Sequence, residues 1–205
     1  QEEDDLEAFL LVFPTDIAPI VGQQVTIGPA NFLIGDVGSR ITLMTTRASN
    51  SFESSVLGGV VTACDVIVKT VEGGVAKGYF SAAGAIFTPD DNGPNITEAA
   101  LRAKADPGGD AQTLTYTAVP PGSGARMGID RDEDSLPNGT ETNTGVFVDA
   151  NDTGSNPALA DTDGDGFEDG VEVASNTDPN DSLNFPGSVP LLSPLLILLL
   201  GGSLV

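Results

Sequence analysis

A chain of 205 residues is long enough for one medium domain with appendages, or for two small domains with hydrophobic cores. Its 30 acidic and 8 basic residues give a formal net charge of -22, which repels phosphates, so we expect no nucleic-acid partner. A single cysteine, Cys64, and the lack of His exclude a disulfide framework, imidazole zinc sites and histidine-dependent catalytic triads.

Residues 1–20 are predicted to hold an amphipathic helix. Its apolar residues recur at helical spacing: Leu6, Phe9, Leu10 and Phe13. Acids at residues 2–5 precede them, where the positive end of a helix dipole favours negative charge, and Pro14 ends the helix. The simplest interpretation is a docking helix. The chain begins with Gln1 and no basic stretch, which fits a mature secreted chain without its signal peptide.

Residues 21–127 are predicted to form a mainly β domain, a small β-sandwich or barrel-like fold with short helices. Runs rich in β-branched and aromatic residues alternate with clusters of Gly, Asn and Pro. The expected strands cover residues 24–27, 40–46, 64–71, 75–81 and 113–119. Glu-Gly-Gly at residues 72–74 supplies the positive φ of a tight hairpin, so its flanking strands should pair. Cys64 is interpreted as a buried small apolar residue.

One helix is expected within this β domain. Asn95 and Glu98 have the spacing of a helix N-cap and its reciprocal partner, and residues 99–105 favour a helix. Asp-Pro-Gly-Gly at residues 106–109 ends it. Residues 113–129 are interpreted as a strand and a glycine loop, without the incoming helix of an EF-hand pair. We therefore expect a structural role for the acidic loops that follow rather than a switching one.

Residues 128–187 form a distinct acidic segment, which is predicted to be loop-rich and stabilised by calcium. They hold 15 of the 30 acids and one basic residue, Arg131, and the chain has no Lys or Arg after it. Two like charges about 5 Å apart repel by roughly 3 kcal/mol at an effective dielectric near 20. A compact state therefore needs counter-cations, and bound divalent ions would supply them.

A twelve-residue frame in this segment, residues 161–172, matches the calcium-loop pattern at every defined position. Ca²⁺ takes six to eight oxygens, and short carboxylates at alternate positions converge as the chain curls around the ion. Gly166 permits the sharp turn of the loop. The predicted ligands are Asp161, Asp163, Asp165, the carbonyl of Phe167, Asp169 and a bidentate Glu172.

A second frame begins 31 residues earlier, at Asp130, and gives tandem calcium-binding repeats. Its predicted ligands are Asp130, Asp132, Asp134, Leu136, Asn138 and Glu141. Ser135 stands where the pattern requires Gly, so that residue must adopt the turn at some cost. We expect weaker binding here than at the other frame, the alternative being a turn-rich linker.

The stretch DTDGDGFEDGVEVASNTDPND, at residues 161–181, resembles the thrombospondin type 3-like calcium repeats of bacterial cell-surface proteins. In that family the acidic loop, a short helix and a T-D-P step wind around successive calcium ions, which implicates Asp178 as a further ligand. The same resemblance suggests Asp149 and Asp152, although no complete frame contains them.

Residues 188–205 form an uncharged, leucine-rich tail that resembles the hydrophobic part of bacterial C-terminal sorting signals, without the usual terminal arginines. Prolines and Gly201-Gly202 interrupt it, and it is short for a membrane-spanning helix. Three interpretations compete: a trimmed membrane anchor, a segment that packs into a neighbouring subunit, and a core element of its own chain. We favour the second interpretation. Membrane contact, if the protein makes any, is expected only through this tail.

The leading hypothesis is a secreted, non-enzymatic, calcium-binding cell-surface protein. Calcium would stiffen the acidic repeats, and the hydrophobic ends would join copies into a homo-oligomer or polymer, such as an extracellular filament or surface layer. The alternative is an adhesion or carbohydrate-binding module, but two Tyr and no Trp offer few rings for sugars. An enzyme is not expected, because the candidate acids are already assigned to calcium.

Overall fold

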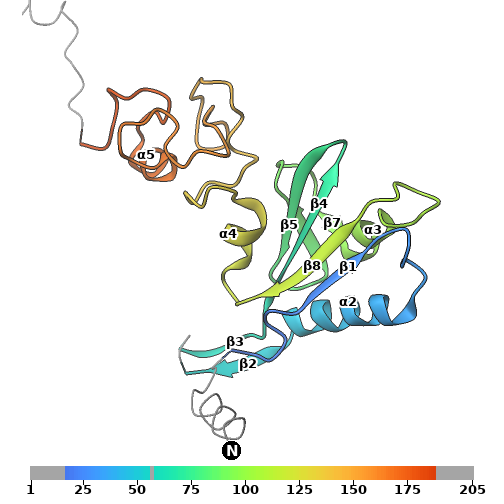
Figure 1. Ribbon diagram of the computed structural model, residues 1–205. Helices are drawn as coiled ribbons and strands as arrows, with labels where there is room; N and C mark the ends of the chain where they lie inside the picture. Colours follow the sequence, from blue (N-terminus) through green and yellow to red (C-terminus); the bar gives the residue numbers. More distant parts are fainter. Residues whose placement is uncertain (1–16, 56–57, 188–205) are drawn as a thin grey trace, which may run out of the picture. The chain divides into compact units, whose positions relative to one another are not determined.

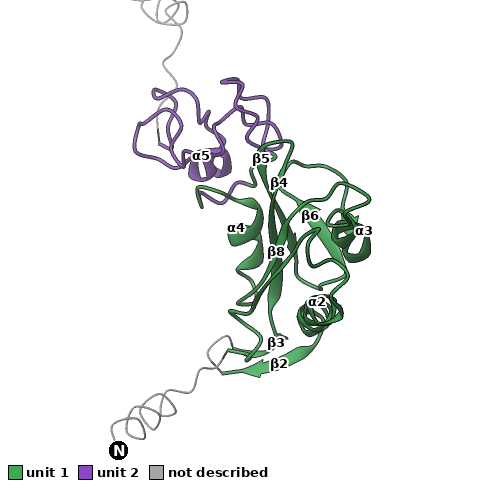
Figure 2. Ribbon diagram, turned by 45° about the vertical axis from the view of Figure 1, so that its right-hand side comes forward, with its two compact units in different colours: residues 1–133, 137–139 green, residues 134–136, 140–205 purple. Residues whose placement is uncertain are grey.

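The computed structural model describes residues 17–55 and 58–187, which divide into two compact units (Figure 2). Unit 1 takes residues 1–133 and 137–139, and unit 2 takes residues 134–136 and 140–205. The predicted amphipathic helix at residues 2–13 and the leucine-rich tail after residue 187 lie outside the described residues.

Unit 1 is built on a six-stranded antiparallel sheet with the strand order β1-β8-β4-β5-β6-β7 (Figure 1). Its strands are β1 (Gln24–Ile27), β4 (Asp65–Glu72), β5 (Val75–Ser81), β6 (Ile86–Pro89), β7 (Ile96–Thr97) and β8 (Leu114–Val119). A separate hairpin pairs β2 (Ser51–Ser54) with β3 (Gly59–Thr62). The prediction of a mainly β domain with short helices is confirmed, and the architecture is consistent with a small β-sandwich-like domain.

The hairpin between β4 and β5 forms where the sequence predicts it. Glu72 pairs with Val75, and the two residues between them, Gly73 and Gly74, have φ angles of 59° and 87°. Positive φ at both central positions matches the twist of the flanking strands, and Gly adopts it without a steric cost.

The central strand β4 is covered on both faces, so its consecutive residues Val66, Ile67 and Val68 are all buried. On one face Val66 and Val68 join the core that includes Ile41 and Met44 of α2 (Gly35–Ala48). On the other face α4 (Gly124–Ile129) packs against β4 and β5. The predicted burial of Cys64 is confirmed, because its side chain is fully buried and burial raises its thiol pKa to about 11.

Two local predictions for the chain before β8 are wrong. Residues 40–46, expected as a strand, belong to helix α2, because burial of Ile41, Met44 and Ala48 at helical spacing outweighs the β preference of its threonines. The helix α3 (Glu98–Ala103) is capped by Thr97 rather than Asn95, and the Thr97 hydroxyl accepts a hydrogen bond from the Ala100 amide.

Within its described part, unit 2 has one short helix, α5 (Asp169–Ser175), and one isolated β-bridge, and otherwise consists of turns and loops. Its buried side chains are mostly polar. Apolar Leu136 is accompanied by a larger set of buried polar residues: Asp134, Thr140, Glu141, Thr153, Ser155, Asp169 and Glu172. Hydroxyls satisfy some of this interior, since Thr153 bonds the Thr140 carbonyl at 3.1 Å and the Ser155 hydroxyl at 2.8 Å.

Close contact between α4 and the sheet depends on Gly78 of β5, and Gly78→Ala tests it. A methyl group there would overlap the Gly128 carbonyl of α4, which also accepts a hydrogen bond from Lys69 Nζ at 2.8 Å. We expect the substitution to lower the free energy of unfolding by roughly 1–3 kcal/mol in thermal or urea denaturation. Gly35→Ala is the control, because open space surrounds Gly35 at the start of α2, and equal losses would contradict the packing argument.

Candidate metal centre

The frame at residues 161–172 forms a curled loop whose first three carboxylates converge. Asp161, Asp163 and Asp165 place carboxylate oxygens within 4.8 Å of one another. Backbone amides hold the curl, because Gly164 and Gly166 donate to the Asp161 carboxylate at 2.8 and 3.0 Å. Gly166 has a φ of 101°, as expected for the sharp turn of a calcium loop. The first half of the predicted ligand set is therefore assembled.

Glu172, the last residue of this frame, is fully buried in the first turns of α5. Neither of its carboxylate oxygens has a hydrogen-bond donor within residues 17–55 and 58–187, and Asp163 Oδ2 and Asp165 Oδ2 are also buried without one. Burial, followed by the charges of Asp163 and Asp165, raises the Glu172 pKa to about 8. Buried carboxylate oxygens that face other carboxylates fit a hard divalent cation, which would satisfy them all.

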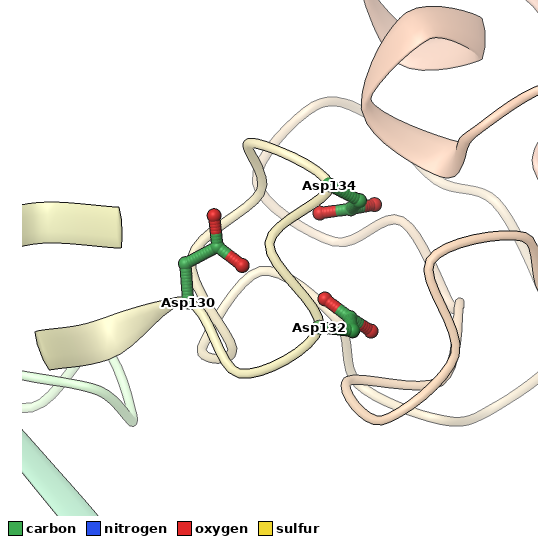
Figure 3. A group of neighbouring side chains, drawn as sticks. All are labelled: Asp130, Asp132 and Asp134. Carbon is green, nitrogen blue, oxygen red and sulfur yellow. The ribbon is translucent and has the colours of Figure 1, made fainter. Parts of the chain in front are cut away.

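The frame at residues 130–141 begins directly after α4. Asp130, Asp132 and Asp134 come from alternate positions of one short loop (Figure 3), and their carboxylate oxygens also lie within 4.8 Å of one another. The Glu133 amide donates to Asp130 Oδ1 at 2.7 Å, which tightens the turn. The expectation of a glycine loop before this frame is wrong, because the helix α4 occupies residues 124–129.

Ser135 adopts the conformation that the loop pattern assigns to Gly. Its φ of 83° is positive, as is the φ of 101° at Gly166 in the equivalent position of the other frame. A side chain in this region meets its own backbone at a cost of roughly 1–2 kcal/mol. The departure from the pattern at Ser135 therefore leaves the loop shape intact and adds local strain.

A third carboxylate group combines residues from both frames. Asp134, Glu141 and Asp169 are all buried and place oxygens within 4.8 Å of one another. Asp169 accepts hydrogen bonds from the Thr162 amide and hydroxyl at 2.8 and 2.6 Å. The predicted ligand Asp169 thus lies beside Asp134 and Glu141 of the other frame. A twelve-residue sequence pattern cannot predict this contact, because it covers only one frame.

Gly170 makes this approach possible and was missed by the sequence patterns. Its amide donates to Asp134 Oδ2 at 3.1 Å, and a methyl group on its Cα would overlap the Asp134 carbonyl oxygen. Its position in the frame carries no requirement for Gly, so the sequence signal is weak. The requirement comes from a second stretch of chain.

Asn138 is held by hydrogen bonds within unit 1. Its Oδ1 accepts from the Arg131 amide at 2.8 Å, and its Nδ2 donates to Asp90 Oδ2 at 3.3 Å. Asn92 bonds the neighbouring Gly139 carbonyl at 2.6 Å. The loop after β6 therefore fixes residues 138–139, and Asn138 has a structural role in addition to the predicted ligand role.

Two predicted ligands, Leu136 and Phe167, would act through main-chain carbonyls, which leaves their side chains free to pack. The Leu136 side chain is buried, and its amide donates to Asp134 Oδ1 at 2.8 Å. The Phe167 ring stacks on Phe185, with ring centroids 5.9 Å apart and planes within 1° of parallel. Phe185 thereby secures the end of the described chain against the calcium-type loop.

Four predicted carboxylate ligands lie outside the carboxylate groups found among the described residues: the buried Glu172, and Asp149, Asp152 and Asp178. Asp149 and Asp152 face each other across an isolated β-bridge, where Asp152 Oδ1 accepts from the Thr142 hydroxyl at 2.6 Å. Asp178 Oδ1 accepts from the Asn180 amide at 2.9 Å, which forms a local turn. These contacts give Asp149, Asp152 and Asp178 roles in shaping loops.

Comparison with known proteins supports the calcium interpretation of unit 2. Residues 161–182 match the family described as bacterial TSP3 repeat, which confirms the resemblance predicted for this segment. That repeat is a structural calcium-binding unit rather than an enzyme family, and it is typically extracellular. No curated protein and no solved structure matches the chain. Of the helices in residues 17–55 and 58–187, none is long and apolar enough to cross a membrane.

Exchanging the residues at the sharp turns tests the strain assigned to Ser135. Ser135→Gly should stabilise the protein by about 0.5–1 kcal/mol, because Gly adopts positive φ without the side-chain clash. Gly166→Ser introduces the same clash into the other frame and should destabilise it by about 1 kcal/mol or more. Urea denaturation in excess calcium measures both changes. A loss of stability in Ser135→Gly would contradict the strain argument.

Proposed function

We propose that the protein is a secreted structural protein in which bound Ca²⁺ stiffens the acidic unit. The observation that carries the proposal is the fully buried Glu172, whose two oxygens have no donor among the described residues and lie beside other carboxylates. No basic residue follows Arg131 in the sequence, so lysine and arginine side chains of this segment cannot neutralise these charges. A divalent cation is the remaining counter-charge of suitable chemistry.

Each ligand set combines a carboxylate group with the glutamate that ends its frame. Asp161, Asp163, Asp165 and Glu172 would hold one ion, with the Phe167 carbonyl between them in the frame. Asp130, Asp132, Asp134 and Glu141 would hold another ion. Asp169 could add a further oxygen ligand to it, because an Asp169 oxygen lies within 4.8 Å of oxygens of Asp134 and Glu141. The chemistry that calcium supplies here is charge neutralisation and cross-linking of loops, which a protein with a polar interior needs in order to stay compact.

The proposed setting is outside the cell, at the surface. TSP3 repeats are typically extracellular. Calcium sites of extracellular modules have dissociation constants of about 10⁻⁴ to 10⁻³ M, which suit the calcium that is constantly present outside cells. Constant occupancy suits a structural element better than a sensor. We further propose that the apolar ends of the chain join copies into a filament or surface layer.

The adhesion alternative receives less support from the described residues. Sugar-binding platforms usually present exposed aromatic rings, and both tyrosines of the chain, Tyr79 and Tyr116, are buried. The chain contains no Trp. Binding to a glycan array above background would revive this alternative.

Calcium binding at the frame of residues 161–172 is tested by Glu172→Gln. Titration calorimetry should show an affinity loss of roughly tenfold or more, because the variant loses a charged bidentate ligand. Without calcium, the variant should be at least as stable as the wild type, because the substitution removes a carboxyl group whose charged form is disfavoured by burial.

The matched control is Glu168→Gln, which removes the same charge from an exposed residue at the start of α5. It should retain nearly wild-type affinity. In the wild type, calcium at about 100 times its dissociation constant should add roughly 2.7 kcal/mol of stability for each site. Equal affinity losses in the two variants, or a melting temperature that calcium leaves unchanged, would reject the proposal.

Assembly is tested separately by electron microscopy of the full chain with calcium and with a chelator. Filaments or sheets with calcium are the expected result, because a stiff acidic unit gives neighbouring copies a fixed geometry. Single particles at all protein concentrations tested would reject self-assembly while leaving calcium binding intact.

A further inference from the structure

A shallow apolar groove lies between α2 and β1 in unit 1. β1 stands at the edge of the six-stranded sheet, and α2 packs against this end of it (Figure 1). The groove has a volume of about 690 Å³ beside β1, and a second hollow of about 320 Å³ meets it at Leu43. Apolar side chains line the two parts: Ile20, Val25, Val37, Leu43 and Phe52. Leu43 itself is 46 % exposed, so solvent reaches apolar surface along α2.

The groove carries basic side chains in a strongly acidic protein. Arg40 and Arg47 of α2 line it, and both are exposed. Asp36 is the single acid among its described lining residues. Two of the 8 basic residues of the chain therefore border one apolar groove, while the whole chain has a net charge of -22. A ligand with an apolar face and an acidic end complements this surface.

The chain contains one segment with this chemistry outside the described residues. Residues 2–13 combine an apolar stripe at helical spacing with an acidic start that includes Glu2, Glu3, Asp4 and Asp5. A helix of these 12 residues would be about 18 Å long, and the 14 residues of α2 span about 21 Å, so the two match in length. The tail at residues 188–205 is also apolar, but it has no acid to meet Arg40 and Arg47.

We propose that residues 2–13 of one copy bind the α2–β1 groove of a second copy, with the acidic start near the arginines. This inference rests on the proposed self-assembly and names the surface that would mediate it. A neighbouring copy is the favoured donor because residues 18–20 themselves line one end of the groove, so a chain's own segment would have to reverse within residues 14–16. Pro14 favours an extended exit there instead. Each copy then offers one segment and one groove, which allows head-to-tail growth.

Sedimentation velocity of the full chain over a range of concentrations, in constant calcium, tests this contact. The wild type should form larger species as its concentration rises. Leu10→Glu places a charge in the apolar stripe of the segment, and Arg47→Glu reverses a charge of the groove. Each should raise the concentration needed for assembly by roughly tenfold or more. Arg126→Glu is the matched control, because Arg126 is exposed, lies outside the groove and undergoes the same change of charge.

Mixing the two defective variants separates a neighbour's segment from the chain's own. Leu10→Glu still has an intact groove and Arg47→Glu an intact segment. An equimolar mixture should therefore form dimers, but assembly should stop there and give no chains of three or more copies. A mixture that stays monomeric, or assembly lost only on removing residues 188–205, would overturn the proposal. Calorimetric calcium titration of the same variants keeps the tests independent, since a failed groove contact leaves calcium affinity unchanged.

Discussion

The polar interior of unit 2 is the constraint on which the acidic half of the protein depends. Asp134, Glu141, Asp169 and Glu172 are buried carboxylates, and the sequence offers no lysine or arginine after Arg131. Two such charges about 5 Å apart repel by roughly 3 kcal/mol even at an effective dielectric near 20. Hydrogen bonds from backbone amides offset part of this cost, but Glu172 has no donor for either oxygen in the described chain. Cations that bridge the carboxylates would turn the repulsion into attraction.

The two units are stabilised by different physics. Unit 1 has an apolar core around Val66, Val68 and Met44, with helices against both faces of its sheet, and hydrophobic burial stabilises it. Unit 2 buries few apolar side chains among its described residues and relies on turns, hydroxyl contacts and carboxylate groups. Changes of calcium concentration should therefore affect unit 2 first, while the β domain keeps its fold.

Local rules predicted much of the structure, and contacts between distant residues account for the rest. The Gly73-Gly74 hairpin and the curl at Gly166 follow from positive φ, a property of the residues themselves. Residues 40–46 failed as a strand because burial of Ile41 and Met44, rather than threonine preference, decides the conformation. The approach of Asp169 to Asp134 and Glu141 was equally out of reach, since it depends on the packing of two repeats at Gly170.

Hydrogen exchange of the unit 2 amides, with calcium and with a chelator, tests the central claim most directly. The informative amides are those that the carboxylate loops hold, including the amides of Gly164, Gly166 and Gly170. The account predicts slow exchange at these sites in calcium and near-complete loss of protection without it, while β4 and β8 stay protected in both conditions. Equal protection of these glycine amides with and without calcium would contradict it.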